Sequence, residues 1–371
     1  MASADNRIGI GIVGCGHVSG VYLKNLARLR ATRVLACADL DIDRARARAA
    51  EFGVPKACSV EAMLDDPEVE IVLDLTVATA HAAVCAAAVE SGKHVFAEKP
   101  LCTTRADGAA LLERAAKAGV RIGAAPDTFL GAAHQTCRKL IDDGAIGEPV
   151  GAAGFLLCHG NEEWHPNPEF FYEAGSGPMI DMGPYLLAAM INLLGPVRSV
   201  AGMGRASSRR RVVGSGPKAG NPIAVETATH TAGLIEFANG SVGAIVTSFD
   251  VWATELPAME IYGTEGTIGA PNPKSFGGPV RLRRRGEPAW REVAPTHGFG
   301  GDCRGIGVAE MAEAIRSDRP HRASGALAYH VVDALCGLAD FSTGGRRYEL
   351  KSNVDRPAML PAGHRVDTLD A

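Results

Sequence analysis

The chain begins with a strand, a glycine turn and a helix in direct succession. Residues 8–13 are rich in isoleucine and valine, which is typical of a strand buried on both faces. The turn Gly14-Cys15-Gly16 follows, and a helical pattern runs from Val18 to Leu29. Gly14 permits a tight turn, Gly16 lets the backbone approach an anion, and the start of the helix offers free N–H groups. A dinucleotide-binding turn requires this order, although Ser19 occupies the third glycine position.

A carboxylate follows the second strand at the spacing that a dinucleotide site needs. The strand at residues 33–38 ends at Asp39, which lies 23 residues after Gly16. An acidic residue about 20 residues after the glycine turn binds the ribose hydroxyls of NAD, and its charge repels the 2′-phosphate of NADP. The position therefore predicts NAD. The alternative role is an N-cap of the next helix at Asp39, Asp41 or Asp43, which is compatible with binding.

Strands and helices alternate through the first third of the chain. Further strands are expected at residues 70–76, 94–97 and 120–124, and helices at 43–52, 81–90 and 104–118. This alternation predicts a doubly wound parallel sheet of the α/β class. Ligands bind such sheets at the carboxyl ends of the strands, so the residues that follow each strand are the candidates for a site.

The residues after the strand at 94–97 are Glu98-Lys99-Pro100. A lysine at this edge of the sheet could hydrogen-bond a substrate hydroxyl and stabilise the alkoxide that develops on it. The alternative is an ordinary pair of charged surface residues.

Composition excludes several classes of protein. With 371 residues, 46% of them hydrophobic and 22% charged, the chain is long and apolar enough for two globular domains. A net charge of −4 gives no indication of a nucleic acid or a membrane as partner. The N-terminal residues are polar, without a signal segment, and no apolar run reaches membrane-spanning length. The nine cysteines include no C-x-x-C pair. We expect reduced thiols, no metal and a cytoplasmic protein.

Two arginine runs and one histidine are expected to have structural rather than ligand-binding roles. Residues 209–211 and 283–285 are Arg-Arg-Arg among Gly, Ser and Pro. They are expected to be solvated, and the alternative is a rim that binds an acidic substrate. His330 lies in an otherwise apolar helical pattern and is expected to be a core histidine.

Four stretches together resemble the Gfo/Idh/MocA family, named for glucose–fructose oxidoreductase and inositol dehydrogenase. They are Gly11-Ile-Val-Gly-Cys-Gly16, Ala88-Val-Glu-Ser-Gly-Lys-His-Val-Phe-Ala-Glu-Lys-Pro-Leu101, Gly177-Pro-Met-Ile-Asp-Met-Gly-Pro-Tyr185 and Tyr262-Gly-Thr-Glu-Gly266. The resemblance implies a Rossmann domain at residues 1–128, an α+β domain with an open, mostly antiparallel sheet at 129–345, and a tail at 346–371. A β-rich pattern after Val197, with a hairpin turn at Asn239-Gly240, supports the second domain.

The resemblance also implies an NAD(P)-dependent oxidoreductase of sugars, cyclitols or related polyols, assembled as a homodimer or homotetramer through its C-terminal sheet. Val77 stands where family members often have proline. The implied cofactor contacts are Gly14, Cys15, Gly16, His17, Val18, Asp39, Leu40, Thr76, Val77, Ala78, His81, Glu98 and Lys99.

The implied catalytic residues include one departure from the family pattern. Lys99 corresponds to the catalytic lysine, and Asp181 to an aspartate followed four residues later by a proton-accepting histidine. Here the later residue is Tyr185, still on the same helical face. Tyrosine has an ordinary pKa near 10 and is a poor base unless a cation such as Lys99 lowers that pKa. His165 is the alternative base, unless it belongs to a packed loop.

The expected substrate contacts extend over both domains. Trp164, beside His165, could stack on a sugar face, and Asp127 and Thr128 occupy positions where the family contacts substrate or the nicotinamide ribose. The full set of expected substrate contacts is Lys99, Asp127, Thr128, Trp164, His165, Asp181 and Tyr185.

Three functions are compatible with these residues. The first is an NAD-dependent dehydrogenase for a secondary hydroxyl of a sugar, glycoside or cyclitol, with the 3-hydroxyl of a glycoside as one possibility. The second is a redox-neutral glycosidase, in which transient oxidation of the 3-hydroxyl acidifies the C2 proton so that tyrosinate suffices as base. The third is a non-catalytic, NAD-binding regulatory protein, against which the presence of Lys99 and Asp181 argues.

Overall fold

The computed structural model describes residues 6–340 and 344–362, which form two compact units. Unit 1 contains the described residues of 6–135, 295–329 and 357–362, and unit 2 contains those of 136–294 and 330–356. This grouping differs from the continuous domains expected at 1–128 and 129–345, because the chain returns to unit 1 after residue 294. Residues 341–343 and the last part of the expected tail, 363–371, lie outside the described residues.

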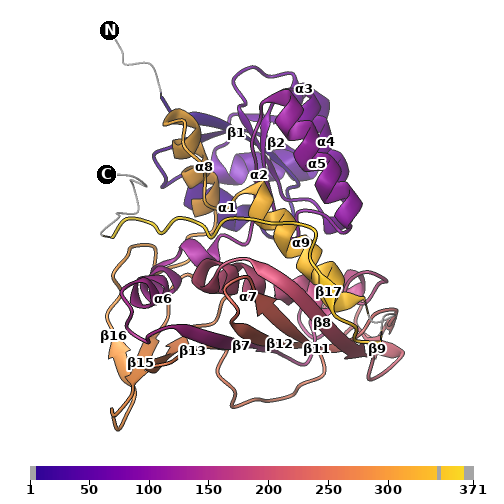
Figure 1. The fold of residues 1–371 in the computed structure, drawn as a ribbon. Coiled ribbons are helices and arrows are strands. Elements are labelled where there is room, and N and C mark those ends of the chain that lie inside the picture. Colours follow the sequence, from indigo (N-terminus) through magenta and orange to yellow (C-terminus); the bar gives the residue numbers. More distant parts are fainter. Residues whose placement is uncertain (1–5, 341–343, 363–371) are drawn as a thin grey trace. The chain divides into compact units, whose positions relative to one another are not determined.

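Unit 1 is built on a six-stranded parallel sheet in the order β3-β2-β1-β4-β5-β6 (Figure 1). The strand order reverses at β1, which lies between β2 and β4, and such a switch point is where doubly wound sheets bind ligands. The expected Rossmann sheet is therefore confirmed. Its elements are β1 (Ile8–Val13), α1 (Ser19–Leu26), β2 (Thr32–Ala38), α2 (Ile42–Phe52), β3 (Lys56–Cys58), α3 (Val60–Leu64), β4 (Ile71–Asp74), α4 (Ala78–Glu90), β5 (His94–Ala97), α5 (Arg105–Ala118), β6 (Ile122–Ala124) and α8 (Ile306–Arg316).

The alternation of isoleucine and glycine in β1 has a packing reason. Ile8, Ile10 and Ile12 are completely buried on one face of the strand. On the other face, a Cβ added to Gly11 would lie 2.5 Å from the sulfur of Met63 in α3. Because α3 approaches the sheet this closely, β1 needs a residue without a side chain there.

Unit 2 is built on a nine-stranded sheet in the order β16-β15-β14-β13-β7-β12-β11-β8-β17 (Figure 1). The pairs are antiparallel except for β7 with β12, which confirms the expected open, mostly antiparallel sheet. Gly240 turns between β11 and β12 with φ +86°, as the Asn-Gly hairpin predicts. The strands are β7 (Pro149–Leu157), β8 (Val197–Arg205), β11 (His230–Phe237), β12 (Val242–Ser248), β13 (Met259–Gly263), β14 (Gly266–Ala270), β15 (Val280–Arg284), β16 (Arg291–Val293) and β17 (Tyr348–Glu349).

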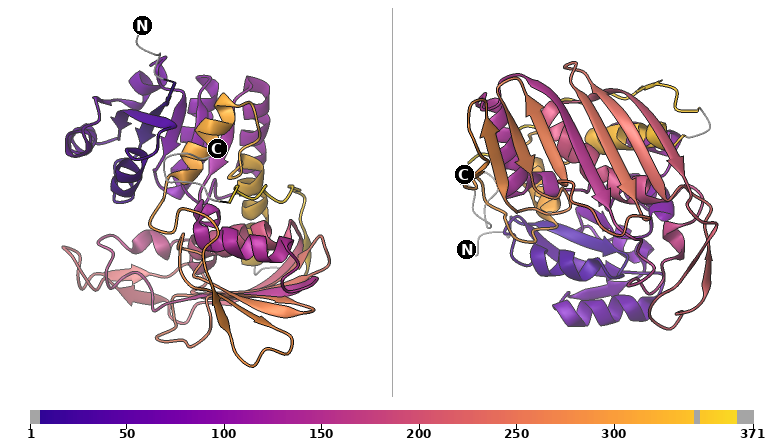
Figure 2. Two further views of the ribbon diagram at one scale, coloured as in Figure 1. Left: turned by 90° about the vertical axis from the view of Figure 1, so that its left-hand side faces the viewer. Right: turned by 90° about the horizontal axis from the view of Figure 1, so that it is seen from below.

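Helices cover one face of this sheet. The long helix α7 (Pro178–Leu194) packs on β7, β11 and β12. Leu338, near the end of α9 (Gly325–Ala339), lies against Gly202 of β8 and Gly233 of β11. The opposite face, seen from below in the right-hand view of Figure 2, is free of helices in the described part of unit 2. A separate two-stranded ribbon, β9 (Arg210–Val212) with β10 (Pro222–Ala224), and helix α6 (Ala132–Asp142) complete the elements used below.

Within residues 6–340 and 344–362, no helix combines the length and the apolar character that crossing a membrane requires.

Candidate functional site

The glycine turn after β1 has one position that must be glycine and one that opens to empty space. Gly14 has φ +96°, and a Cβ there would lie 2.7 Å from the backbone of Leu75. A Cβ on Gly16 would meet nothing within 4 Å. No side chain caps the N-terminus of α1, which begins just after this open position. An uncovered helix N-terminus beside a bare backbone fits the pyrophosphate of a dinucleotide.

Two side chains brace this turn. Ser19, at the third glycine position, is buried and donates its hydroxyl hydrogen to the carbonyl of Gly16 at 2.7 Å. Arg48 of α2 donates to the same carbonyl at 3.2 Å. The departure from glycine at position 19 therefore replaces a close helix contact with a hydrogen bond. Sequence reasoning missed Arg48, whose helical position carries no signal of its own.

Asp39 lies at the end of β2 with both carboxylate oxygens already accepting hydrogen bonds. The N–H of Cys15 donates to Oδ2 at 2.8 Å, and the N–H of Asp41 donates to Oδ1 at 2.9 Å. The Arg44 guanidinium lies 3.5 Å from Oδ1. Asp41, not Asp39, caps α2, by accepting from the N–H of Asp43. Asp39 thus links the glycine turn to the end of β2 and keeps a carboxylate at the position predicted for ribose.

Apolar side chains are exposed at the same edge of the sheet. Leu40, after β2, is fully exposed, and Val77, after β4, is 63% exposed. Thr76 is held in place because its hydroxyl donates to Asp74 at 2.6 Å. Ala78 starts α4 directly after Val77. Exposed apolar residues at a polar edge offer surface against which a flat ring can pack.

Glu98 and Lys99 follow β5, two strands away from β1 in the sheet. Tyr22 of α1, which is completely buried, donates its hydroxyl hydrogen to Glu98 Oε1 at 2.8 Å. The N–H of Lys99 donates to Glu98 Oε2 at 3.0 Å. Burial and the nearby Glu98 carboxylate raise the pKa of Tyr22 well above its ordinary value. Glu98 and Lys99 are partly exposed. Through Tyr22, α1 fixes the Glu98 carboxylate, and this carboxylate orients the backbone N–H of Lys99.

His81 of α4 joins two of the strand-end turns. It is 1% exposed, with Nδ1 2.8 Å from the carbonyl of Pro100 and Nε2 3.2 Å from the carbonyl of Thr76. These contacts tie the turn after β5 to the turn after β4. Its predicted contact with cofactor stays a prediction.

Asp127 and Thr128 lie after β6 and are both buried. Asp127 Oδ2 accepts hydrogen bonds from the N–H groups of Gly305 at 2.9 Å and Gly307 at 3.0 Å, at the start of α8. Burial raises the pKa of Asp127 to about 6, and the two N–H donors oppose that shift. These contacts favour a structural role for Asp127, and the substrate contacts expected of both residues remain predictions.

In unit 2, Asp181 and Tyr185 lie one turn apart on α7. Tyr185 is 8% exposed, and Asp181 is partly exposed in the first turn. Gly177, with φ +97°, is the N-cap of the helix, and Pro178 is its first residue. Pro184 lies inside the helix. The structure places both side chains near the beginning of one buried helix.

Trp164 and His165 lie in the loop between β7 and α7, among aromatic rings. His165 makes edge contacts with Trp164, Phe170 and Phe171, each with ring centroids 5.4 Å apart. Its Nδ1 accepts a hydrogen bond from the N–H of Asn167 at 3.1 Å. The neutral ring therefore carries its proton on Nε2. Trp164 is 61% exposed.

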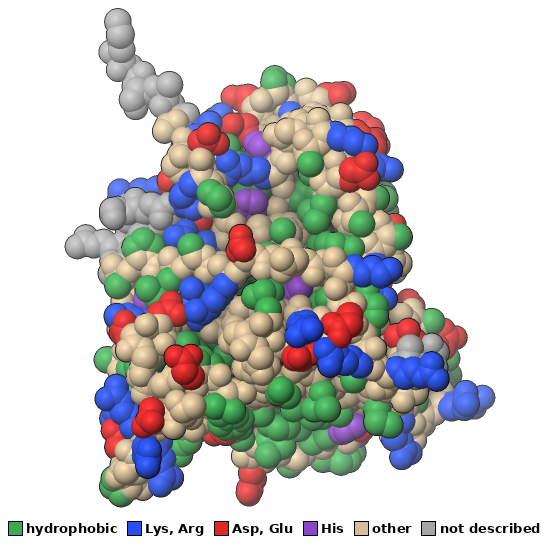
Figure 3. All heavy atoms as spheres, in the orientation of Figure 1, with side chains coloured by type: hydrophobic (Ala, Val, Ile, Leu, Met, Phe, Trp, Pro, Cys, Tyr) green, Lys and Arg blue, Asp and Glu red, His purple; other side chains and the backbone are tan. Residues whose placement is uncertain are grey.

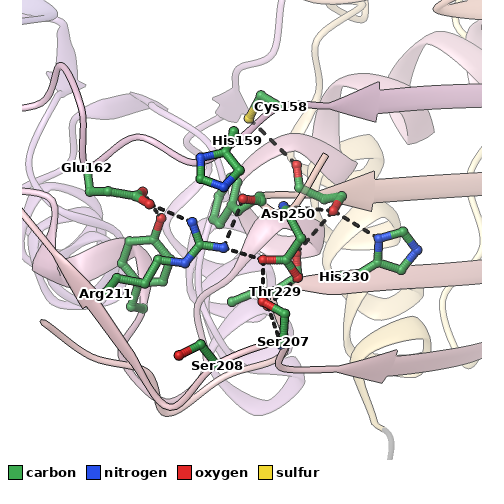
Figure 4. Close-up of polar contacts among 12 residues, drawn as sticks. Cys158, His159, Glu162, Ser207, Ser208, Arg211, Thr229, His230 and Asp250 are labelled. Carbon is green, nitrogen blue, oxygen red and sulfur yellow. Dashed lines mark hydrogen bonds and ion pairs between the residues drawn. The ribbon is translucent and has the colours of Figure 1, made fainter. Parts of the chain in front are cut away.

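A buried polar cluster, which sequence reasoning missed, holds this loop to the β9–β10 ribbon (Figure 4). The Arg211 guanidinium pairs with Glu162 at 2.5 Å and with Asp250, and Tyr172 donates to Glu162. Arg211 and Glu162 are only 8% and 6% exposed. The run Arg209–Arg211 was expected to be solvated. That expectation is wrong for Arg211, because the ribbon turns its side chain inward while Arg209 and Arg210 stay exposed.

Among the described residues, no three His, Cys, Asp or Glu side chains are grouped so as to hold a metal ion.

Comparisons with known proteins agree with this geometry. A family profile described as an oxidoreductase family with an NAD-binding Rossmann fold matches residues 8–125, and the GFO/IDH/MocA C-terminal domain profile matches residues 134–269. A 1,5-anhydro-D-fructose reductase of Ensifer adhaerens is 27% identical over 270 residues, which cover 70% of this chain and 74% of the relative. A levoglucosan dehydrogenase of Pseudarthrobacter phenanthrenivorans is 28% identical over 294 residues, covering 71% and 73%.

A solved structure confirms the fold over almost the whole chain. The NAD-binding oxidoreductase of Klebsiella pneumoniae superposes with a TM-score of 0.82 and 24% identity, covering 94% of this chain and 100% of that one. The two profiles together match well over half of the sequence. The expectations of an oxidoreductase and of NAD as its cofactor are thus confirmed, and the chain belongs to the Gfo/Idh/MocA family of oxidoreductases with an NAD-binding Rossmann fold.

Proposed function

We propose that the protein is an NAD-dependent dehydrogenase that oxidises a secondary hydroxyl of a sugar, glycoside or cyclitol, with the 3-hydroxyl of a glycoside as one candidate. The observation that carries the proposal is the position of Lys99. It follows β5, at the same edge of the parallel sheet as the open glycine turn and Asp39. The named sugar enzymes among its relatives, acting on 1,5-anhydrofructose and levoglucosan, support this substrate class.

The residues of unit 1 fit a bound NAD. Gly16 leaves space for a pyrophosphate, the N-terminus of α1 is uncapped, and Asp39 offers a carboxylate where ribose hydroxyls are expected. The charge of Asp39 also disfavours a 2′-phosphate. When bound, NAD would supply the hydride acceptor. The chain itself has to hold the hydroxyl and remove its proton.

Each proposed catalytic residue has one task. Lys99 donates a hydrogen bond to the substrate oxygen and stabilises the negative charge that develops there. The carbinol hydrogen leaves as hydride, and the hydroxyl proton passes to a base. We assign that base to Tyr185 in preference to His165. The Nδ1 of His165 already accepts from Asn167, so its Nε2 holds a proton and cannot accept another. Asp181 orients the sugar through its hydroxyls.

The test is NADH formation by the purified protein with a panel of sugars, aryl glycosides and cyclitols. Lys99→Ala is expected to lower kcat by about a hundredfold or more, as the loss of a transition-state donor does, while NAD affinity changes by less than about threefold. Lys117→Ala is the control, because Lys117 lies exposed on α5 and pairs only with Glu113 among the contacts described. Absence of NADH with every substrate, or full activity of Lys99→Ala, would refute the proposal. Release of the aglycone without accumulation of NADH would identify the glycosidase instead.

We also propose that the open face of the unit 2 sheet joins copies of this chain into a homodimer or homotetramer. Met203, Leu234 and Val242, on adjacent strands, are 70%, 60% and 56% exposed. Figure 3 shows hydrophobic side chains gathered on the lower surface, over the sheet drawn in Figure 1. Exposed apolar patches of this kind mark interaction surfaces.

A cytoplasmic location remains our proposal as well. Its support is that all nine cysteines are free thiols in the structure.

A further inference from the structure

Trp252 is a large apolar side chain that the fold holds out of the core. Its side chain is 77% exposed, the highest value for any aromatic residue described. Trp252 directly follows Val251, whose N–H donates to the carbonyl of Cys158 at 3.1 Å. This hydrogen bond continues the pairing of β12 with β7 beyond the two strands. Leaving this much apolar indole surface in water is unfavourable. A ligand that covers the ring would remove this cost.

The indole is held flat against a second ring. His159, the residue after Cys158, stacks on it with ring centroids 3.2 Å apart and ring planes within 15°. The His159 side chain is mostly buried, at 27% exposure. Since His159 covers one face of the indole, the other face is the exposed one. The pair forms a rigid aromatic plate at the ends of two adjacent parallel strands.

The backbone under this plate is fixed from several sides. The Arg211 guanidinium donates to the carbonyl of Phe249 at 3.0 Å and pairs with Asp250 (Figure 4). Asp250 also accepts from the hydroxyls of Thr229 and Ser207, each at 2.7 Å. The buried polar cluster described above therefore ends at the residues that position Trp252. A plate held this way loses little conformational entropy when a ligand binds to it.

The surroundings of the plate suit a sugar ring. A pyranose has a face of C–H bonds that packs on an aromatic ring and a rim of hydroxyls that needs polar partners. Glu163 lies beside His159 at 3.8 Å and is 65% exposed, and Thr254 and Glu255 are exposed just after Trp252. The indole offers the apolar surface, and these exposed side chains, close to the plate in sequence or next to His159, offer polar partners for hydroxyls.

The plate and Asp181, which we assign to catalysis, lie at the same end of the unit 2 sheet. Asp181 is in the first turn of α7, and a Cβ on the N-cap residue, Gly177, would lie 2.8 Å from the carbonyl oxygen of Ala228. The carbonyl of the next residue, Thr229, accepts from the N–H of Phe249 at 2.8 Å, just after β12. The start of α7 therefore lies beside the strand end that carries Trp252.

We propose that the exposed face of Trp252, backed by His159, binds a second sugar ring of the substrate, next to the ring that is oxidised. The inference deepens the proposed function and rests on it for the identity of the first ring. It predicts that disaccharides or larger glycosides are better substrates than the matching monosaccharides. Binding energy from the second ring would appear mainly in kcat/KM.

Binding can be tested without any turnover. The chain has three tryptophans, so Trp164→Phe with Trp290→Phe leaves Trp252 as the only indole fluorophore. We expect its emission to change saturably with cellobiose or maltose in the absence of NAD, and with glucose only at five- to tenfold higher concentration. A response without any sugar oxidation would support the second-ring site while refuting the dehydrogenase. Absence of a response to every sugar would overturn the site.

Catalysis supplies the second test. Trp252→Ala is expected to lower kcat/KM about five- to tenfold for the disaccharide and less than twofold for the monosaccharide. Trp252→Phe should recover part of the loss. Trp290→Phe is the control, because Trp290 lies beside Arg281, just before the edge strand β16. Equal losses for both sugars would overturn the proposal. So would a smaller assembly of Trp252→Ala with unchanged sugar binding, which would identify Trp252 as a subunit contact.

Discussion

Gly14 and Gly16 lie two residues apart in one turn, but the space around their Cα atoms differs. Gly14 combines a left-handed backbone, φ +96°, with the backbone of Leu75 where a Cβ would have to lie. Gly16 has no such restriction, because a Cβ there meets nothing within 4 Å. Its side of the turn is open, which leaves room for the pyrophosphate of a bound NAD.

This difference predicts that alanine at position 14 mainly lowers stability, whereas alanine at position 16 mainly weakens NAD binding. Gly14→Ala should lower the free energy of unfolding by about 3 kcal/mol or more, from backbone strain and the clash. Gly16→Ala should change it by less than about 1 kcal/mol but weaken NAD binding at least about tenfold, because the new methyl group takes the place of the pyrophosphate. Urea unfolding and calorimetric NAD titration measure the two quantities. Unchanged NAD affinity of Gly16→Ala would contradict the assignment of this turn.

His330 shows a polar residue fully satisfied inside the core, as the sequence predicts. Nε2 accepts from the N–H of Val197 at 2.9 Å, and Nδ1 lies 2.8 Å from the Ser352 hydroxyl. Burial lowers the pKa of the imidazole from 6.5 to about 4, and the nearby Asp333 carboxylate only partly opposes the shift. The histidine is therefore neutral in the folded protein at any pH above that value.

Stability should consequently depend on pH through His330. Between pH 4 and 6.5 the unfolded chain binds a proton that the folded chain does not bind, so stability falls as the pH falls through this window. His330→Gln keeps the hydrogen-bonding groups and removes the titration. The loss of unfolding free energy from pH 7 to pH 5 should be about 2 kcal/mol larger in the wild type than in His330→Gln. Urea unfolding at both pH values checks this, and identical losses would show that His330 is not the responsible group.

At the scale of elements, buried ion pairs link the β9–β10 ribbon to the loop after β7 and to the end of β12. Arg211 comes from the ribbon, Glu162 from the loop, and Asp250 from the end of β12. A buried guanidinium between two carboxylates is sensitive to the removal of one partner, because the remaining charge cannot be solvated. Backbone hydrogen bonds from Gly214 to Glu162 and from Glu226 to Tyr172, each 2.8 Å, support the same contact.

Arg211→Met should therefore destabilise unit 2 by about 3–5 kcal/mol, by leaving Glu162 buried and unpaired. Arg210→Met is the matched control on the same strand, since Arg210 is exposed, and should change stability by less than about 0.5 kcal/mol. The double variant Arg211→Met with Glu162→Gln should recover part of the loss. Urea unfolding of the four proteins gives the comparison. Equal stability of the two single variants would mean that the ion pairs contribute nothing.

At the scale of the whole molecule, we expect the exposed apolar face of the unit 2 sheet to contact a second copy of the chain. Leu234 lies on β11, an inner strand of the sheet, opposite Ala244 of β12 and Ala201 of β8. In the single chain its side chain is 60% exposed, so a charged residue there disturbs nothing inside the unit. A charge buried between two copies of the sheet would disfavour assembly strongly.

Leu234→Glu is expected to convert the assembled protein into a smaller species while the unfolding curve of the chain stays two-state. Val212→Glu is the control, because Val212 is similarly exposed, at 55%, but belongs to the β9–β10 ribbon. Light scattering after size-exclusion chromatography measures the masses. A wild-type monomer, or equal masses for Leu234→Glu and wild type, would show that the sheet is not the interface.

Local sequence was sufficient where neighbours along the chain decide the outcome. The glycine turn, the alternation of strands and helices, the Asn239-Gly240 hairpin and the buried His330 follow from backbone conformation and from the period of apolar residues. For the same reason, the family could be identified from short motifs such as Glu98-Lys99-Pro100. Each of these features is determined by residues that lie close together in the sequence.

The tertiary structure decided what depends on partners far apart in the chain. By sequence, Arg211 resembles its two solvated neighbours, but in the fold Glu162, 49 residues before it, and Asp250, 39 residues after it, enclose its side chain. The stacking of Trp252 on His159, and the return of residues 295–329 to unit 1 through Asp127, have the same origin. A single sequence shows which side chains can be charged, aromatic or buried. Only the folded chain determines which of them meet, because burial and pairing energies arise between residues that the sequence keeps apart.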